Sequence, residues 1–341
     1  MPPPLEARAP AVFFSNGKGD RLLSLPALRA LVALFGKRLT LLCDCGAASF
    51  FRSELELKEI VEITDHGTRR EFDVGRATAA VKGCDLLLSL VPWSSEALDQ
   101  FIRATASRLS VGFGPSFDVP LARDFRKHAA DLAFDLPLFL DPSLGIGAFA
   151  GPLRFERGAH RRARHMLAPL PTSIRVLTLH ADTFQEKTWQ AHRMKEVIDR
   201  FLASHRDFVV IVVGMEDCTF HGDRSRARVL DCCRLPLDLT MQLVGLSDLF
   251  LGVDSCMLHA ADLGRVPGVG LFGGTRSAEF GFRFGPHRHI DAGSMDEIAV
   301  DDVLTALIEV SRISHRSRLP RRYVDASHGI SADELAIREA H

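Results

Sequence analysis

Near the start of the chain, a glycine-rich segment carries one acidic side chain into a helical pattern. Residues 15–20 read Ser-Asn-Gly-Lys-Gly-Asp and follow an apolar stretch. Glycines permit a tight turn and close approach of a ligand, and the helix N-terminus that follows favours negative charge. The segment lacks the Lys-Ser/Thr pair of a P-loop and the glycines of a dinucleotide fingerprint. Asp20 is therefore either a helix cap or a general base facing a cleft, and the segment leaves both roles open.

A second polar segment, residues 252–264, combines a hydroxyl group with an imidazole. An apolar strand pattern ends at Gly252, and a helical pattern opens near Ser255. The N–H groups of the helix start, together with the Ser255 hydroxyl, would make a cradle for a diphosphate. His259 lies four residues later on the same helix face and could donate to a phosphate oxygen. The alternative is a capped helix with a satisfied histidine.

Three further loops of the second half follow apolar strand patterns in the same way. Lys187 lies in the first and could neutralise a departing diphosphate, or be one more surface lysine. Glu216 lies in the second and could hold a ribose or a base edge. The third, residues 273–276, has flexible glycines suited to a phosphate or sugar contact. Loops at the carboxyl ends of strands line the ligand crevice of open α/β sheets, so the four loops together indicate a binding site.

Short aliphatic runs alternate with longer helical patterns and predict the elements that position these loops. The expected strands are 11–14, 39–43, 60–63, 86–91 and 109–113 in the first half, and 174–179, 208–213, 249–251 and 269–272 in the second. Their continuous apolar character is typical of parallel sheets covered on both faces. Helical spacing runs from Leu22 to Phe35 and stops at Gly36, a plausible C-terminal cap. Because the pattern restarts after residue 170, we predict two doubly wound α/β domains.

Composition is consistent with this organisation. The chain has 341 residues, 46% of them hydrophobic and 25% charged, with a formal net charge of -1. That length suits two domains, which we place at 1–165 and 166–315, with a tail at 316–341 that could return to the first. The near-neutral charge argues against nucleic acid as a partner. Residues 154–165 form the densest basic stretch, either a solvated helix face or a rim attracting an anionic acceptor.

Compartment and metal content can also be addressed from the sequence. The longest aliphatic run, 209–213, is far too short to span a membrane, and the first residues lack the pattern of a signal peptide. Seven cysteines show neither a disulfide framework nor zinc-ligand spacing. We therefore expect a cytoplasmic protein without a transmembrane segment, while peripheral membrane contact stays open.

Three elements, in this order, resemble the ADP-heptose:lipopolysaccharide heptosyltransferases of glycosyltransferase family 9. Gly19-Asp20 leads into a leucine-rich helix with Pro-Ala-Leu at 26–28, as in that family's opening signature. Lys187-Thr188-Trp189 is similar to its Lys-x-Trp element. The Asp-Ser-x-x-x-His-x-Ala run at 254–261, followed by Leu-Phe-Gly at 271–273, resembles its signature in the donor-binding domain. The resemblance extends from about residue 11 to 310.

The resemblance implies a GT-B architecture, in which an acceptor domain and a nucleotide-sugar domain face each other across a cleft. It also implies inverting, metal-independent sugar transfer, without a cofactor beyond the nucleotide-diphosphate sugar. ADP-heptose is the first donor it suggests, and the acceptor would be a saccharide, a lipid-linked molecule or a small metabolite. Two alternatives stay open: a nucleotide-sugar hydrolase or epimerase of the same architecture, and a non-catalytic nucleotide-sugar-binding protein.

The same resemblance assigns roles to individual residues. Asp20 would take the acceptor proton, while Lys187, Ser255 and His259 would stabilise the leaving diphosphate. Cys256 stands where the family usually has glycine, so its side chain is expected to crowd the phosphates or to reorient the turn. The full expected donor side is Glu216, Asp254, Ser255, Cys256, His259, Gly273, Gly274 and Thr275, and the expected acceptor side is Asn16, Gly17, Lys18 and Gly19.

Overall fold

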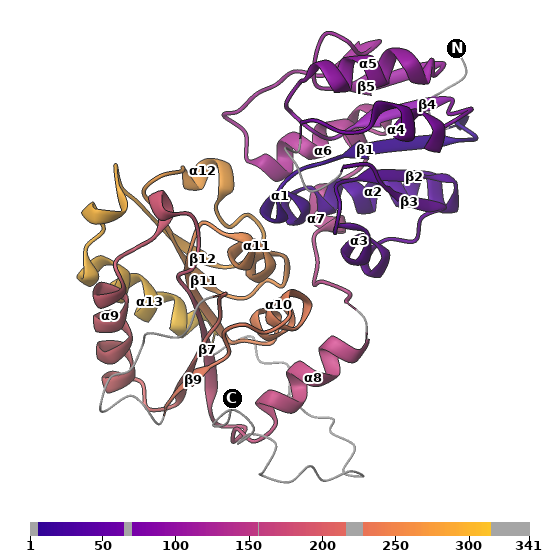
Figure 1. Ribbon diagram of the computed structural model, residues 1–341. Coiled ribbons are helices and arrows are strands. Elements are labelled where there is room, and N and C mark those ends of the chain that lie inside the picture. The colour runs from indigo at the N-terminus through magenta and orange to yellow at the C-terminus, as the bar shows by residue number, and fades with distance from the viewer. Residues whose placement is uncertain (1–5, 65–69, 156, 216–227, 315–341) are drawn as a thin grey trace, which may run out of the picture.

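A computed structural model describes residues 6–64, 70–155, 157–215 and 228–314 (Figure 1). These residues form two parallel sheets of six strands each. The order is β3-β2-β1-β4-β5-β6 in the first sheet and β12-β11-β10-β7-β8-β9 in the second. Read in the opposite direction, the second order repeats the first, so both sheets have the doubly wound arrangement. The expected α/β architecture is confirmed.

The first sheet and its helices occupy the N-terminal half. The pairs α2 with α6 and α4 with α5 pack together around it. The elements are β1 (Pro10–Phe14), α1 (Lys18–Leu23), α2 (Leu25–Phe35), β2 (Thr40–Cys43), α3 (Ala48–Glu54), β3 (Glu59–Glu62), α4 (Val74–Ala80), β4 (Leu86–Ser89), α5 (Glu96–Thr105), β5 (Leu109–Gly112), β6 (Val119–Pro120), α6 (Ala129–Leu140) and α7 (Ile146–Phe149).

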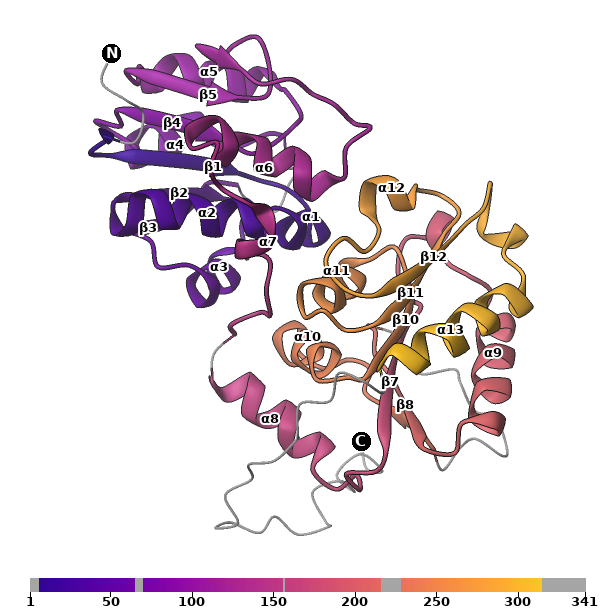
Figure 2. The same cartoon turned by 180° about the vertical axis from the view of Figure 1, so that it is seen from behind.

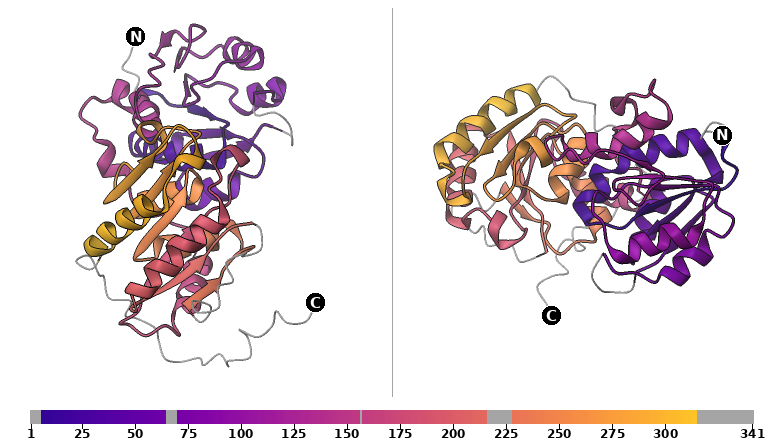
Figure 3. Two further views of the ribbon diagram at one scale, coloured as in Figure 1. Left: turned by 90° about the vertical axis from the view of Figure 1, so that its left-hand side faces the viewer. Right: turned by 90° about the horizontal axis from the view of Figure 1, so that it is seen from above.

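The second sheet follows after α8 (Arg157–Leu167), which spans the predicted domain boundary. Helices α9 and α13 cover its outer face, whereas α10 and α11 lie on the face turned towards the first domain (Figures 2 and 3). The elements are β7 (Arg175–His180), α9 (Ala191–Ser204), β8 (Phe208–Val212), β9 (Val229–Asp231), α10 (Leu237–Gly245), β10 (Leu249–Val253), α11 (Cys256–Leu263), β11 (Gly268–Phe272), α12 (Ser277–Phe280), β12 (His287–Asp291) and α13 (Val300–Ser314).

Each apolar run expected to be a strand forms one, with bounds that differ by a few residues at most. The single helix expected from Leu22 to Phe35 is instead two helices, α1 and α2, which meet at Ser24. Pro26 explains the break, because its ring fits the first turn of α2 but would remove a hydrogen bond within a continuous helix. The expected end is confirmed: Gly36 follows α2 with a φ of 58°.

The segment between the two sheets is fixed by a buried ion pair of the first domain. Arg29 on α2 and Glu54 on α3 lie 2.6 Å apart. Arg29 also donates to the backbone oxygens of residues 149, 151 and 152, and Glu54 accepts the backbone N–H of Arg154 at 2.6 Å. We call this arrangement the linker clamp, because it binds the chain where it leaves the first domain.

The domains also touch directly. Helices α1 and α11 pack against each other. Arg283 forms an ion pair with Asp131 at 2.9 Å, and His128 Nε2 lies 2.9 Å from the Gly281 oxygen. None of the helices in the described ranges combines the length and apolar character that a membrane crossing requires. The predicted tail at 316–341 lies outside the described residues.

Candidate active site

Asp254 is the point where three loops of the second domain meet. It follows β10 directly, and its side chain is 5% exposed. One carboxylate oxygen, Oδ2, accepts hydrogen bonds from Lys187 Nζ at 2.6 Å and from Thr275 Oγ1 at 2.8 Å. Because strands β7, β10 and β11 are parallel neighbours, the loops after them share one edge of the sheet. The sheet order therefore brings together residues that are distant in the sequence.

A buried tryptophan holds Lys187 in place. Lys187 ends a short helical turn, Gln185–Lys187, two residues before Trp189. Trp189 is 1% exposed in the core of the second domain, and its indole N–H donates to the Ile298 oxygen at 3.3 Å. The Lys187 side chain remains 26% exposed, so its ammonium group is fixed by Asp254 and still open to a ligand. In the Lys-x-Trp element, the buried tryptophan therefore anchors the segment that carries the lysine charge.

Ser255 and His180 form a second polar contact beside Asp254. Ser255 is the N-cap residue of α11, but its side chain does not cap the helix. Instead Ser255 Oγ lies 3.0 Å from His180 Nδ1, at the end of β7. Burial lowers the pKa of His180 to about 4, so this imidazole is neutral at physiological pH. His180 was not singled out by the sequence reasoning, although its place at a strand's carboxyl end was a usable signal.

His259 connects this cluster to the other domain. Burial lowers its pKa to about 4, against the opposing effect of Asp254, whose Oδ1 lies 3.8 Å from His259 Nε2. Within the described part of the chain, His259 Nδ1 is buried and has no hydrogen-bond partner. A Cβ atom placed on Gly19 would lie only 3.4 Å from His259 Cδ2. The start of α1 therefore lies beside the imidazole ring, at a separation that would place such a Cβ in ordinary van der Waals contact.

The expected acceptor side lies at this approach. Asp20 Oδ2 accepts the Gly17 N–H at 3.1 Å, so the carboxylate does cap its own helix. Gly17 N–H also reaches Asn16 Oδ1 at 3.0 Å. Asp20 is half-buried and follows Gly19, which lies beside His259 where α1 packs against α11. The cap role that the sequence left open is thus observed, and the general-base role stays a prediction.

The remaining expected donor residues divide into described and undescribed ones. Gly273 packs against the backbone of residues 294–295 and Gly274 against the Glu186 oxygen, at distances that a Cβ could not accept. Cys256 is half-buried at the start of α11, where burial raises the pKa of its thiol and the nearby Lys18 charge lowers it. Glu216 lies outside the described residues. No group of three or more potential metal ligands occurs among the described side chains.

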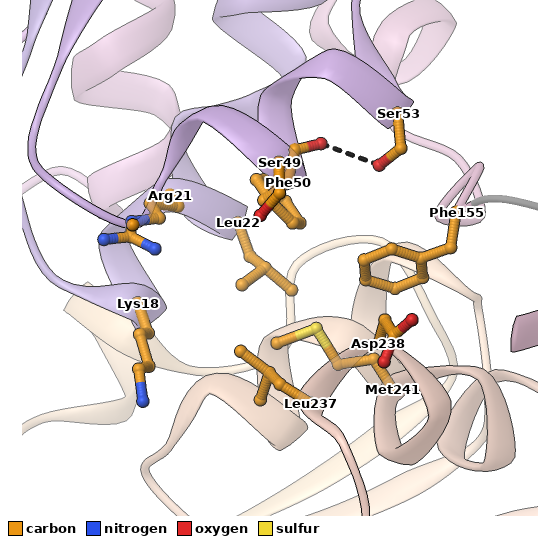
Figure 4. Close-up of a pocket in the computed structure, with 11 residues that line it drawn as sticks. Lys18, Arg21, Leu22, Ser49, Phe50, Ser53, Phe155, Leu237, Asp238 and Met241 are labelled. Atoms are coloured by element: carbon orange, nitrogen blue, oxygen red, sulfur yellow. Dashed lines mark hydrogen bonds between the residues drawn. The ribbon is translucent and has the colours of Figure 1, made fainter. Parts of the chain in front are cut away.

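A cavity of about 350 Å³ opens between the domains beside α1 (Figure 4). Lys18, Arg21 and Leu22 of α1 line it, together with residues of α3 and α10. The basic helix α8 instead borders a separate hollow lined by Arg154, Arg161 and Arg164. The basic stretch thus lies beside the interdomain cavity, and Phe155 lines both.

Two doubly wound sheets with ligand loops at their facing edges define the GT-B class of glycosyltransferase. Residues 154–291 match the model of glycosyltransferase family 9 (heptosyltransferase), which confirms the resemblance for that part of the chain and indicates a glycosyltransferase. The sequence has no significant match among curated proteins. The opening signature around Asp20 lies outside the matched residues.

Solved structures share the fold over nearly their whole length. A family 9 glycosyltransferase from Veillonella parvula has 15% identity and a TM-score of 0.71, covering 90% of this chain and 97% of its own. ADP-heptose LPS heptosyltransferase II from E. coli has 13% identity and a TM-score of 0.67, covering 90% and 99%. The E. coli heptosyltransferase WaaC with ADP has 15% identity and a TM-score of 0.63, covering 89% and 99%. At these identities the likeness concerns the fold.

Proposed function

We propose that the protein is an inverting, metal-independent glycosyltransferase that moves a sugar from a nucleotide-diphosphate donor, ADP-heptose first, to an acceptor hydroxyl. One observation carries the proposal: the imidazole of His259, from the donor-side motif, lies against Gly19 of the motif that contains Asp20. The two segments that a transferase needs for donor and acceptor therefore meet across the domain boundary. A protein that only bound a nucleotide would not need that meeting.

The proposed roles follow from charge and protonation. Asp20 takes the proton of the acceptor hydroxyl as its oxygen attacks the anomeric carbon. The bond from that carbon to the diphosphate breaks, and Lys187 neutralises the charge that develops on the leaving group. His259, which is neutral because burial lowers its pKa to about 4, contributes as a hydrogen-bond donor. Asp254 holds Lys187 and Thr275 in position.

The metal-independent part of the proposal rests on Lys187. Its ammonium group is fixed at 2.6 Å from Asp254 and remains partly exposed at the carboxyl edge of the sheet. A fixed cation there can supply the charge stabilisation that a divalent metal supplies elsewhere. We also propose a cytoplasmic location, a reducing compartment in which free thiols such as those of the six described cysteines persist.

The test uses the full-length chain with ADP-heptose and a panel of saccharide and small-molecule acceptors. ADP release and the mass and anomeric configuration of the product are measured with and without EDTA. We expect inverted product, no loss with EDTA, and a drop of about 10²–10⁴ in turnover for Asp20→Asn. Melting-curve shifts with ADP should stay the same in that variant.

Other outcomes identify the alternatives. Equal ADP release with and without acceptor would indicate a hydrolase. Inversion of a sugar carbon without transfer to an acceptor would indicate an epimerase. ADP binding without turnover, unchanged in Asp20→Asn, would indicate a nucleotide-sugar-binding protein. Retained anomeric configuration or full inhibition by EDTA would contradict the proposed mechanism.

A further inference from the structure

A second hollow lies where the linker between the domains meets α8 and α10, two helices that pack against each other (Figures 1 and 2). We call it the α8 hollow, and its volume of about 410 Å³ suits a small molecule. Residues 153–155 of the linker, three residues of α8 and one residue of α10 line it. Asp20, Lys187 and Asp254 are not among the lining residues, so the α8 hollow is separate from the proposed reaction centre.

The packing of α8 decides which of its side chains can meet a ligand. Ala159, Ala163 and Leu167 recur every four residues, and all three are buried on this helix, which packs against α10. Arg161 and Arg164 are three residues apart and share another face, where both are exposed and line the hollow. Burial of the small apolar residues against the second domain thus turns the two arginines towards the α8 hollow.

A buried amide fixes the wall of the hollow. Gln242 of α10 is 7% exposed, and its Nε2 donates to the Leu153 oxygen at 3.3 Å. Because a backbone carbonyl only accepts, the amide oxygen of Gln242 is directed to α8, where it lies 2.7 Å from His160 Nδ1. His160 Nδ1 is therefore the donor in that bond. One side chain thus joins the linker, α8 and α10, and holds the three segments of the lining together.

The permanently charged side chains that line the α8 hollow are all arginines. Arg154, Arg161 and Arg164 make no ion pair with any described residue. Over residues 154–165 the sequence has five arginines and a single glutamate, Glu156, which lies outside the described residues. One carboxylate can neutralise only one arginine, so a net positive charge remains. The backbone N–H of Arg154 is itself held by the linker clamp at 2.6 Å, which fixes the chain where this array begins.

Three guanidinium groups suit a phosphate monoester better than a carboxylate. A carboxylate has two oxygens, which a single arginine can satisfy in a bidentate pair. A phosphate monoester has three terminal oxygens and nearly two negative charges at neutral pH, so it can accept hydrogen bonds from several arginines at once. Half-buried Leu153 and Phe155 in the lining offer apolar contact to the carbon part of such a molecule.

We propose that the α8 hollow binds the phosphate monoester group of a small soluble molecule, at a site separate from the nucleotide-sugar site. The phosphate oxygens accept from Arg154, Arg161 and Arg164. The ligand thereby joins the linker, which the clamp holds to the first domain, to α8 of the second domain. A lipid headgroup offers the same phosphate chemistry. However, a helix that docks on a membrane turns its apolar face to the lipid, whereas the buried apolar face of α8 is directed into the protein.

Binding is tested by calorimetry on the full-length protein with three probes: phenyl phosphate, methyl phenyl phosphate and benzoate. The first is a monoester, the second is a diester with a single charge, and the third carries a carboxylate on the same ring. We expect phenyl phosphate to bind at least about tenfold more tightly than either of the others. Arg161→Gln and Arg164→Gln should each weaken its binding by about tenfold. Both side chains are exposed, so both variants should fold.

Two variants serve as matched controls. Arg162→Gln removes the same charge from the same helix, but Arg162 is exposed and does not line the hollow, so the affinity should stay within about twofold. Lys187→Met removes the cation of the proposed donor site and should also leave the affinity for phenyl phosphate within about twofold. Circular dichroism melting curves show whether each variant is folded.

The source of the phosphate is tested with vesicles. Phosphatidic acid has a phosphate monoester headgroup, so the protein is sedimented with vesicles of equimolar phosphatidylcholine and phosphatidic acid. We expect the double variant Arg161→Gln/Arg164→Gln to sediment with them to the same extent as the unchanged protein, because the proposed ligand is soluble.

Each contrary outcome overturns a named part of the inference. Benzoate or the diester binding as tightly as phenyl phosphate would overturn the monoester class. Equal losses in Arg162→Gln and Arg161→Gln would show general attraction to a basic surface and overturn the site. A loss in Lys187→Met alone would assign the phosphate to the donor loops. Vesicle binding that requires Arg161 and Arg164 would overturn the soluble source. None of these measurements uses sugar transfer, so a failure here leaves the proposed function standing.

Discussion

The ion pair of Arg29 with Glu54 in the first domain and that of Lys187 with Asp254 in the second differ in what surrounds them. Arg29 and Glu54 lie 2.6 Å apart with side chains that are 7% and 0% exposed. Both Glu54 oxygens accept hydrogen bonds, and Arg29 also donates to backbone oxygens of the linker. Of the Arg29 nitrogens, Nε alone lacks a partner in the described part of the chain. The linker clamp is therefore nearly closed to other partners.

Lys187 and Asp254 are equally close, at 2.6 Å, but their surroundings are more open. The Lys187 side chain is 26% exposed, and the neighbouring His259 has a buried ring nitrogen without a partner among the described residues. A buried polar group without a partner is costly, and at the open carboxyl edge of the sheet a ligand can supply the missing contact. The comparison therefore separates a pair that fixes the chain from a pair positioned to meet a substrate.

The largest effect is expected from opening the linker clamp. Arg29→Met leaves Glu54 as an uncompensated buried charge and should lower the free energy of unfolding by about 3–5 kcal/mol. Urea denaturation followed by circular dichroism measures it. The double variant Arg29→Met/Glu54→Leu should recover part of the loss, because no unpaired charge remains. A loss below about 1 kcal/mol for Arg29→Met would contradict the comparison.

Removing the charge of Lys187, the cation of the second pair, should lower the catalytic rate more than the stability. Lys187→Met is expected to lower turnover by about 10²–10³, because the charge facing the leaving diphosphate is gone. Asp254 keeps its bond from Thr275, so the free energy of unfolding should fall by no more than about 1–2 kcal/mol. Lys195→Met is the control, since that lysine forms a 2.7 Å pair with Asp199 on α9, away from the site. Equal turnover in both variants would remove Lys187 from the mechanism.

Most of the fold could be predicted because the strands that form its core are continuous apolar runs. β6, β9 and β12 were not predicted, and each has a physical reason. All three are edge strands, and they are short or polar, as in the sequence His-Arg-His-Ile-Asp of β12. An edge strand needs only one neighbour and can face solvent, so it carries no strong apolar pattern.

The candidate site was predictable in its residue types but not in its pairings. Lys187, Asp254 and Thr275 could each be placed after a strand, yet their common hydrogen-bonded centre depends on the order β11-β10-β7, which residue spacing does not give. For the same reason the sequence did not show that Ser255 contacts His180 and does not form the helix cap that the pattern allowed as an alternative. When a local sequence pattern allows a side chain two roles, its contacts with residues distant in the sequence decide which role it takes.

The smallest effect is expected from pH, and it tests whether His259 is neutral. Burial lowers the pKa of His259 to about 4, below the ordinary value of 6.5. Between these values the unfolded chain binds a proton that the folded chain does not, so stability falls as pH is lowered through that window. The slope from this group is at most about 1.4 kcal/mol per pH unit. His259→Gln should remove it, whereas His165→Gln, on the exposed face of α8, should not.

The same slope of stability against pH, measured with saturating ADP, tests whether His259 faces the diphosphate. A phosphate beside the imidazole favours the charged ring and would raise the pKa of His259, so the slope of stability against pH should become shallower when ADP is bound. The linker clamp should show no such response, because Arg29 stays charged over this range. An unchanged slope with ADP would show that the buried nitrogen of His259 does not face the diphosphate. The Lys187–Asp254 pair of the second domain would then have a structural role, like the Arg29–Glu54 pair of the first domain.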